Sequence, residues 1–276
     1  MRRIIDAHCH IYPDGISRRA VDAVDRFYDG LPSDHYDGTV QTLLRVGREN
    51  GVTHFVVHSV ATRPEQVRSI NQFIARSVRE ADGAFVGMGT LHPESQEIRQ
   101  DFRELIGMGL HGVKLHPDIQ HFHADDPKAM QIYALCEEQG CPIVVHTGDY
   151  RYDYSNPSRI VPILKAFPRL KLVGAHFGGW SVWEDAVREL PAYPNILVDT
   201  SSSLYWLKPE RAREIIRIWG VERVLYGTDY PLWPQKQEID ALLALGLSPK
   251  EYERIFWKNA AELFGLNLKE EEDSNE

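Results

Sequence analysis

Hydrophobic residues are concentrated in eight short segments that recur along the chain. The segments are 4–10, 53–60, 85–92, 112–116, 142–147, 170–176, 196–200 and 224–229. Most of them are rich in Val, Ile and Leu and lack strict alternation, a pattern typical of strands buried on both faces of a parallel sheet. The segments therefore predict eight parallel strands.

Amphipathic stretches separate these segments and predict helices. They cover residues 18–27, 39–50, 64–80, 126–139, 158–167 and 208–219. Repeated strand–helix–strand units build either a closed barrel or a doubly wound open sheet. The open sheet often carries a glycine-rich phosphate turn after its first strand, and this chain lacks one there. We therefore expect a single-domain (β/α)8 TIM barrel over residues 1–268, followed by an acidic, disordered tail at 269–276.

Composition narrows the classes of function. The 276 residues are 43% hydrophobic and 26% charged, which is ordinary for a globular protein. A chain of this size needs no metal or disulfide to stay folded, so we expect any metal to be functional. The net charge of −9 argues against a nucleic-acid or anionic-membrane surface.

Targeting signals and cysteine usage indicate the compartment. Neither a signal peptide nor a transmembrane segment is expected from the apolar runs. The three cysteines are widely spread and fit no zinc-ligand spacing, which favours reduced, buried thiols. We therefore expect a cytoplasmic protein that acts on a small-molecule substrate, with a homo-oligomer left open.

Histidines gather where the predicted strands end. Six of the twelve histidines lie at such ends, and the last strand ends in Asp229; the six are His8, His10, His92, His116, His146 and His176. In a parallel barrel the carboxyl ends of all strands meet on one face. Imidazoles and a carboxylate converging there predict a site for zinc or a similar divalent ion.

The sequence His8-Cys9-His10 makes this prediction sharper. Side chains alternate along a strand, so residues two apart project to one face. His8 and His10 can therefore bind one ion, while Cys9 turns toward the helices.

Four ordered motifs resemble the amidohydrolase superfamily, in particular the amidohydrolase-related branch that also contains nonoxidative decarboxylases. They are DAHCH at 6–10, VVH at 144–146, GAHFGG at 174–179 and YGTDYP at 226–231. The C-terminal stretch 259–266 is also similar to that branch. The resemblance covers nearly the whole chain and implies a TIM barrel, one or two divalent metals, and usually hydrolysis of an amide or ester-like bond.

The resemblance also implies roles for individual residues. His8, His10, His146 and Asp229 match metal ligands, and Asp229 matches the carboxylate that moves protons. His176 matches a histidine that polarises the substrate or transfers a proton in one-metal members and binds the second ion in two-metal members. We expect Asp229 and His176 to be catalytic, with one zinc ion favoured and two ions possible.

Lys114 decides between one ion and two. Lys114 and His116 share a face of the fourth predicted strand. In two-metal members this strand can supply a bridging carboxylate, either Glu or a carboxylated Lys. The alternatives are that Lys114 and His116 bind an anionic group of the substrate, which we favour, or that Lys114 is a structural residue paired with a carboxylate.

Three further residues are predicted to contact substrate because they follow strand ends. Arg151 lies in the tyrosine-rich loop after the fifth strand, and Trp180 and Trp233 follow the sixth and eighth. Loops after strands form the functional mouth of a barrel. The alternative is that they belong to a solvated loop surface or to loop packing.

These residues predict a metal-dependent hydrolase of a small, carboxylate-bearing amide, lactone or ester. A divalent ion lowers the pKa of bound water, and a neighbouring carboxylate can accept its proton. The alternatives are a nonoxidative decarboxylase and a non-catalytic metal- or ligand-binding barrel. Hydrolysis is favoured because the chain is short and keeps His8, where some decarboxylases of the family carry Glu.

Overall fold

A computed structural model describes residues 3–31 and 35–268 and contains eight strands in one parallel sheet. The strands are β1 (Ile5–His10), β2 (His54–His58), β3 (Phe85–Thr90), β4 (Gly112–Leu115), β5 (Ile143–Val145), β6 (Leu172–Gly174), β7 (Ile196–Asp199) and β8 (Val224–Leu225). Each strand pairs with its neighbours in chain order. Backbone hydrogen bonds such as Ala7 N to Tyr226 O (2.8 Å) and Asp229 N to His8 O (2.9 Å) join the last strand region to the first and close the barrel.

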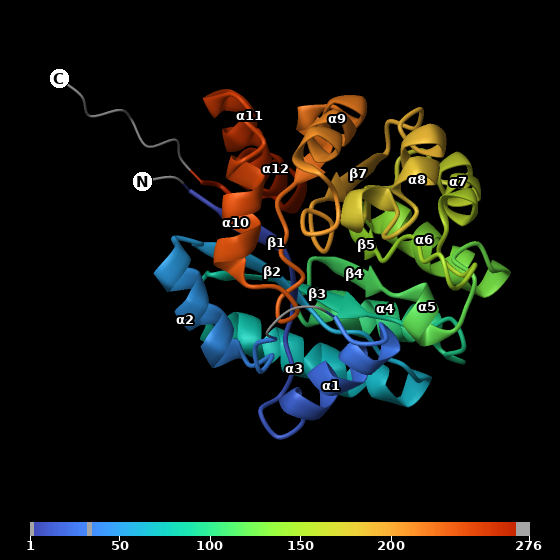
Figure 1. Ribbon diagram of the computed structural model, residues 1–276. Coiled ribbons are helices and arrows are strands. Elements are labelled where there is room, and N and C mark those ends of the chain that lie inside the picture. Colours follow the sequence, from blue (N-terminus) through green and yellow to red (C-terminus); the bar gives the residue numbers. More distant parts are fainter. Residues whose placement is uncertain (1–2, 32–34, 269–276) are drawn as a thin grey trace.

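Helices surround the barrel (Figure 1). They are α1 (Ser17–Phe27), α2 (Val40–Asn50), α3 (Val67–Glu80), α4 (Ile98–Gly107), α5 (Pro117–Gln120), α6 (Pro127–Gln139), α7 (Pro157–Ala166), α8 (Trp183–Glu189), α9 (Pro209–Trp219), α10 (Gln235–Leu243), α11 (Pro249–Glu253) and α12 (Asn259–Phe264). Short helical turns are η1 (Pro64–Gln66), η2 (His176–Gly178), η3 (Val221–Arg223) and η4 (Arg254–Lys258). The TIM barrel is confirmed, and the tail predicted at 269–276 lies outside the described residues.

Hydrophobic side chains form two layers. A large outer layer packs the strands against the helices and includes Cys9, Val113 and Leu115. A smaller inner cluster fills the barrel and is joined by Phe264 of α12. Because the strands are buried on both faces, their sequences lack alternation, as the apolar segments indicated.

Except for β1, which ends at His10 as predicted, the strands end earlier than predicted. β8 covers two residues, whereas the prediction ran on to Asp229, and β6 ends at Gly174 rather than at His176. Both predicted end residues adopt left-handed backbone, with φ of 61° at His176 and 64° at Asp229. A strand cannot continue through that conformation, so these two side chains are presented by turns that follow the strands.

The pairing of β1 with β2 is irregular beside the first histidine. Asp6 pairs with Phe55 and Cys9 with Val57, so β1 has one residue more than β2 over this interval. Such bulges re-aim side chains and often lie next to active sites. His8 lies within the bulge and points into the barrel mouth.

Two further observations concern membrane-spanning helices and the thiols. Within residues 3–31 and 35–268, no helix is both long and apolar enough to cross a membrane. Cys9, Cys136 and Cys141 are free and buried, as the sequence predicted.

Glu238 of α10 is a buried carboxyl group to which no described residue donates a hydrogen bond. It is fully buried, and neither of its oxygens has a hydrogen-bond partner among the described residues. Burial, reinforced by the charges of Asp6 and Asp229, raises the pKa of Glu238 from 4.5 to about 8. The folded state therefore binds a proton that the unfolded state releases, so this group lowers stability as the pH rises from 4.5 to 8.

We predict that Glu238→Gln removes this pH dependence. Relative to the native protein, the Tm of the variant should rise by several degrees between about pH 5 and about pH 9, because Gln cannot ionise. Thermal denaturation across this range measures the effect, with exposed Glu210→Gln on α9 as the control. Parallel Tm curves for native protein and Glu238→Gln would contradict the account.

Candidate metal centre

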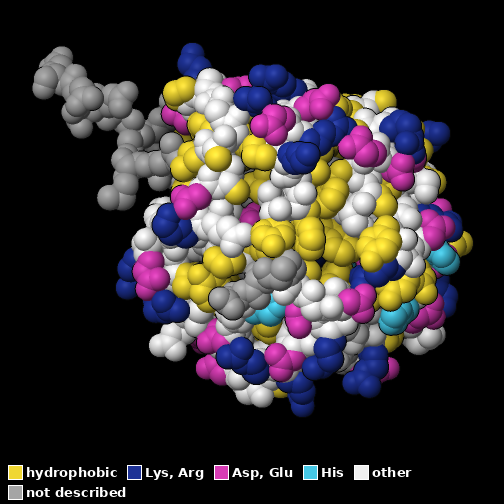
Figure 2. Space-filling model, viewed as in Figure 1, with side chains coloured by type: hydrophobic (Ala, Val, Ile, Leu, Met, Phe, Trp, Pro, Cys, Tyr) yellow, Lys and Arg dark blue, Asp and Glu magenta, His cyan; other side chains and the backbone are white. Residues whose placement is uncertain are grey.

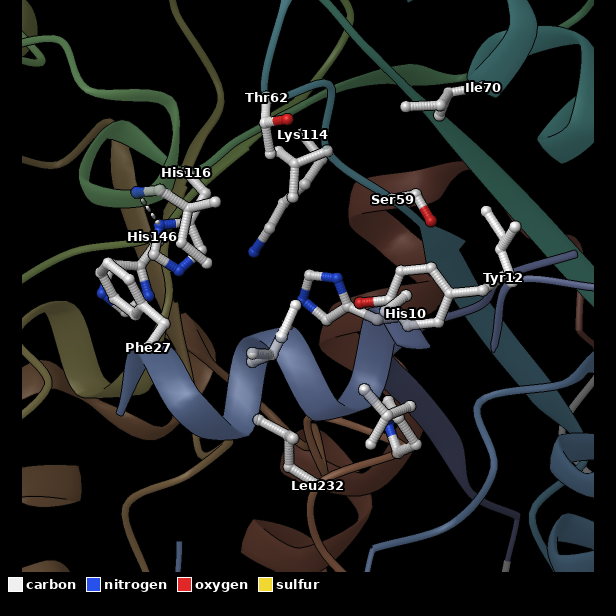
Figure 3. Close-up of a pocket in the computed structure, with 18 of the residues that line it drawn as sticks. His10, Tyr12, Phe27, Ser59, Thr62, Ile70, Lys114, His116, His146 and Leu232 are labelled. Carbon is white, nitrogen blue, oxygen red and sulfur yellow. Dashed lines mark hydrogen bonds between the residues drawn. The ribbon is translucent and has the colours of Figure 1, made fainter. Parts of the chain in front are cut away.

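Polar side chains meet inside the carboxyl-terminal mouth of the barrel. His8 and His10 come from β1 and Lys114 from β4, while His146 directly follows β5. His176 and Asp229 follow β6 and β8. All six of these residues line one cavity of about 830 Å³. Figure 3 shows His10, Lys114, His116 and His146 pointing into this cavity.

Asp199 and Ser201 hold His8 in one orientation. The Nδ1 atom of His8 lies 2.8 Å from Asp199 Oδ2 and 3.1 Å from Ser201 Oγ. Because an ionised carboxylate only accepts hydrogen bonds, Nδ1 carries the proton and the lone pair of Nε2 faces the cavity. A carboxylate behind a histidine is a common arrangement around protein-bound metals.

His146 and His176 present two lone pairs to each other. His176 Nδ1 donates to the carbonyl of Ser201 (3.0 Å), and His146 Nε2 donates to the carbonyl of Gly148 (3.1 Å). The remaining nitrogens, His176 Nε2 and His146 Nδ1, are 2.9 Å apart. Since neither carries a proton in these tautomers, the two lone pairs can bind one cation beside them. Burial lowers the pKa of His176 to about 4, which keeps the ring neutral at neutral pH.

Asp229 reaches the same space. Its Oδ1 atom lies 3.4 Å from His8 Nε2 and 3.5 Å from His10 Nε2. Its Oδ2 atom accepts a hydrogen bond of 2.6 Å from Ser202 Oγ, which in turn accepts one of 2.7 Å from the indole of Trp233. Burial raises the pKa of Asp229 to about 6, although the Ser202 bond and Lys114 oppose the shift. The carboxyl group can therefore exchange a proton near neutral pH.

Lys114 is completely buried inside the barrel. Its Nζ atom is 3.0 Å from His8 Nε2, and its amino end points into the cavity (Figure 3). Burial lowers the pKa of Lys114 to about 8, against the opposing charges of Asp229 and Asp199. The lysine is thus a cation inside the barrel that can meet an anionic substrate group.

His116 is held by the start of α5. Its backbone N–H donates to Gln120 Oε1 (2.8 Å), and its Nδ1 accepts from Ile119 N (3.3 Å). Its ring stacks on His146 with centroids 3.8 Å apart, and its Nε2 bonds Tyr28 OH at 3.0 Å. His116 therefore lies beside Lys114 on one wall of the cavity, as the shared strand face predicted.

His58, at the end of β2, was not singled out from the sequence. It is fully buried, and neither ring nitrogen has a hydrogen-bond partner within the described part of the chain. Its ring lies edge-on to His8 and His10, with centroids 4.8 and 4.4 Å away. His58, together with Asp199 and Ser201, extends the predicted site. Its position at a strand end was the available signal.

Three predicted substrate contacts are not among the residues that line the cavity. The guanidinium of Arg151 binds Asp149 (2.7 Å), Asp29 (3.1 Å) and the carbonyl oxygen of Phe27 (2.6 Å). Trp180 packs against Tyr28, with centroids 4.9 Å apart. Trp233 stands behind Ser202, as described above. Arg151 thus fastens the end of α1, and the two tryptophans contact neighbouring residues; their contact with substrate stays a prediction.

The donor set fits a divalent metal ion. Ligand atoms of His8, His176 and Asp229 all lie within 4.8 Å of one another, and so do those of His8, His10 and His58. Burial holds the pKa of His8 and His10 well below the usual value, so both rings are neutral, as metal binding requires. Another group, of His116, Asp118 and His146, meets the same distance limit on the far side of His146.

Comparisons with known proteins show the family of this chain. The sequence profile of the family described as "Amidohydrolase" matches residues 5–266. A decarboxylase of 2-amino-3-carboxymuconate-6-semialdehyde from Dictyostelium discoideum is 23% identical over 237 residues, which are 72% of this chain. The match covers 66% of that relative, slightly less than two thirds of its length.

Solved structures share the barrel. An uncharacterized TIM-barrel protein from Bordetella bronchiseptica has a TM-score of 0.81 and 22% identity, with 95% of this chain and 98% of that chain covered. A dihydroxybenzoic acid decarboxylase from Polaromonas sp. JS666, solved with manganese and an inhibitor, has a TM-score of 0.74 and 17% identity, with 98% of both chains covered. At these identities the likeness establishes the fold.

We predict that Asp199→Asn weakens metal binding. Asp199 Oδ1 accepts hydrogen bonds from the backbone N–H groups of His176 and Ser201. An Asn oxygen would keep these bonds and turn its NH2 toward His8 Nδ1, which forces the proton of His8 onto Nε2. Metal affinity should fall by roughly 10- to 100-fold, as measured by competition with a fluorescent chelator. Exposed Asp240→Asn is the control, and an unchanged affinity in Asp199→Asn would refute the assignment.

Proposed function

This chain belongs to the amidohydrolase family, and from that premise we propose that it is a metal-dependent, nonoxidative decarboxylase of small carboxylic acids. The observation that carries the proposal is that Lys114 and Asp229, both buried, line one cavity. Lys114 offers a cation for a substrate carboxylate, and Asp229 offers a carboxyl group whose pKa burial raises to about 6. The similarity to two decarboxylases supports the same reaction class.

His8, His10, His146 and Asp229 would hold the metal, with His176 beside them. Imidazole and carboxylate donors suit zinc and manganese alike, and manganese is present in the Polaromonas enzyme. When bound, the ion supplies positive charge that holds substrate oxygens and stabilises negative charge developing on the substrate. The side chains supply the remaining steps.

The proposed reaction replaces a carbon–carboxylate bond by a carbon–hydrogen bond. Lys114 and His116 orient the substrate's anionic group. Asp229, whose Oδ2 is fixed by Ser202, delivers a proton to the carbon that loses CO2. The electron pair of the broken bond forms the new C–H bond. The neutral ring of His176, fixed by the carbonyl of Ser201, accepts a hydrogen bond from the substrate or from a protonated group on it.

Hydrolysis, which the sequence favoured, is the second candidate. One observation favours it: the facing lone pairs of His146 and His176, with Lys114 nearby, offer donors for a second ion if Lys114 becomes carboxylated. A two-metal site of this kind is suited to an activated water that attacks an ester, lactone or amide. The two candidates differ in their products, which makes them separable.

We predict that the native protein releases CO2 from a hydroxybenzoate panel and that Asp229→Asn does not. The variant should keep its Tm within a few degrees, while kcat falls by about 1,000-fold, because the amide cannot carry the proton. Exposed Asp240→Asn should retain full activity. Reactions in ¹⁸O-water distinguish the candidates: label in the product of a lactone or ester, without CO2 release, would establish hydrolysis instead.

A further prediction concerns Lys114 and the number of metals. We expect one ion per chain by native mass spectrometry and activity that does not depend on added bicarbonate. Lys114→Gln should raise KM by roughly 10- to 100-fold, because a charged hydrogen bond to the substrate carboxylate is lost. Exposed Lys236→Gln serves as the control. Two ions per chain, together with dependence on bicarbonate, would favour the bridging carboxylated lysine.

A further inference from the structure

The cavity extends far beyond the polar side chains at its base. Its base is formed by the histidines, Lys114 and Asp229, and its outer part runs between α1 and the beginning of α3. A cavity of roughly 150 Å³ is enough for a benzene ring. At about 830 Å³, this cavity holds a reacting head group and leaves a large volume beside it.

Apolar side chains of two helices make up most of the wall of the outer part, and Arg19, Gln66 and Ser69 also line it. Ile16, Ala20, Val24 and Phe27 line it from α1 and its N-cap, at spacings that place them on one helical face. Ile70 and Phe73 face them from α3. In Figure 3 the ribbon of α1 crosses the cavity, and Ile70 lies at the end opposite His116 and His146.

α1 is poorly packed for a helix over an enzyme cavity. Two of its eleven residues, Ser17 and Val21, are buried, whereas five residues of α3 are. Its apolar face is therefore turned toward open space rather than toward the protein core. The guanidinium of Arg151 donates a hydrogen bond to the carbonyl oxygen of Phe27 and so fixes the carboxyl end of α1. In Figure 2, hydrophobic side chains gather near the middle of the face, above the position that α1 takes in Figure 1, with charged ones around them.

We propose that the substrate is an amphipathic carboxylic acid whose reactive head carries an alkyl or aryl tail, and that α1 and α3 select this tail. This inference rests on the proposed function for the position of the head, which lies against Lys114 and His116. An apolar tail lying between the two helices removes the apolar face of α1 from water. The selecting residues are Ala20, Val24, Ile70 and Phe73.

The test measures binding rather than turnover. Benzoate and its 4-methyl, 4-propyl and 4-pentyl derivatives lack the ring hydroxyl that would assist protonation at carbon, and they bind to the metal-loaded protein without reacting. Calorimetry should show that Kd tightens about three- to fourfold for each added methylene, and roughly 100-fold from the methyl to the pentyl derivative. A Kd that does not depend on tail length would overturn the proposal.

Matched variants locate the tail. Ala20→Trp places an indole in the outer cavity, and it should remove most of the gain from the pentyl tail while benzoate itself binds within about twofold of the native protein. Asp22→Trp, on an exposed position of α1 outside the cavity lining, should leave the whole series unchanged. Ile70→Trp makes the same test from α3 if Ala20→Trp does not fold. A pentyl gain retained in both cavity variants would refute the assignment to these helices.

The outcome separates this inference from the proposed reaction. Tail-dependent binding without CO2 release from any hydroxybenzoate would reject the decarboxylase and keep the apolar tail site. CO2 release from substrates without a tail, together with a Kd that does not depend on tail length, would reject the apolar tail site and keep the decarboxylase.

Discussion

The carboxylate of Asp199 joins three strands at the point where the candidate metal ligands emerge. One oxygen receives the Nδ1 proton of His8 on β1, and the other receives the backbone N–H of His176 after β6 and both donors of Ser201 after β7. Because the four donors converge on one buried carboxylate, the tautomer of His8 and the turn at His176 are fixed together. The lone pairs that face the cavity follow from this arrangement rather than from the histidines alone.

Burial then sets the charge of each group in the mouth. It holds the pKa of His8, His10 and His146 well below the usual value and so keeps these rings neutral. The same burial moves the pKa of Asp229 up to about 6 and that of Lys114 down to about 8. The pKa of a carboxyl group is thereby raised toward 7 and that of an amine is lowered toward 7 within one cavity. This is the condition under which one group can hold a proton while the other holds an anion.

The sequence predicted the barrel and the convergence of His8, His10, His146, His176 and Asp229, because strand periodicity and chain order determine which ends share a face. It did not predict Asp199, since its role depends on the distance between β7 and β1, which lie far apart in the chain. It did not predict that the loop folds back so that Asp149 and Asp29 bind the guanidinium of Arg151, whose contact with substrate stays a prediction. Strand ends can be predicted from a pattern, whereas loop side chains depend on contacts that no periodicity encodes.

The base and the outer part of the cavity differ in how strongly their side chains are held by the surrounding structure. At the base, His8, His146, His176 and Asp229 stand on or directly after strands and are each fixed by at least one buried hydrogen bond, so a change there disturbs several neighbours at once. The outer part of the cavity is covered by the apolar face of α1. This helix has two buried residues and is held mainly at its carboxyl end, by Arg151. Substitutions on that face alter the shape of the outer cavity while the hydrogen bonds of Asp199 and Ser202 stay intact. In such a barrel the chemistry is determined by the strand ends, and the choice of substrate can change independently through one thinly packed helix.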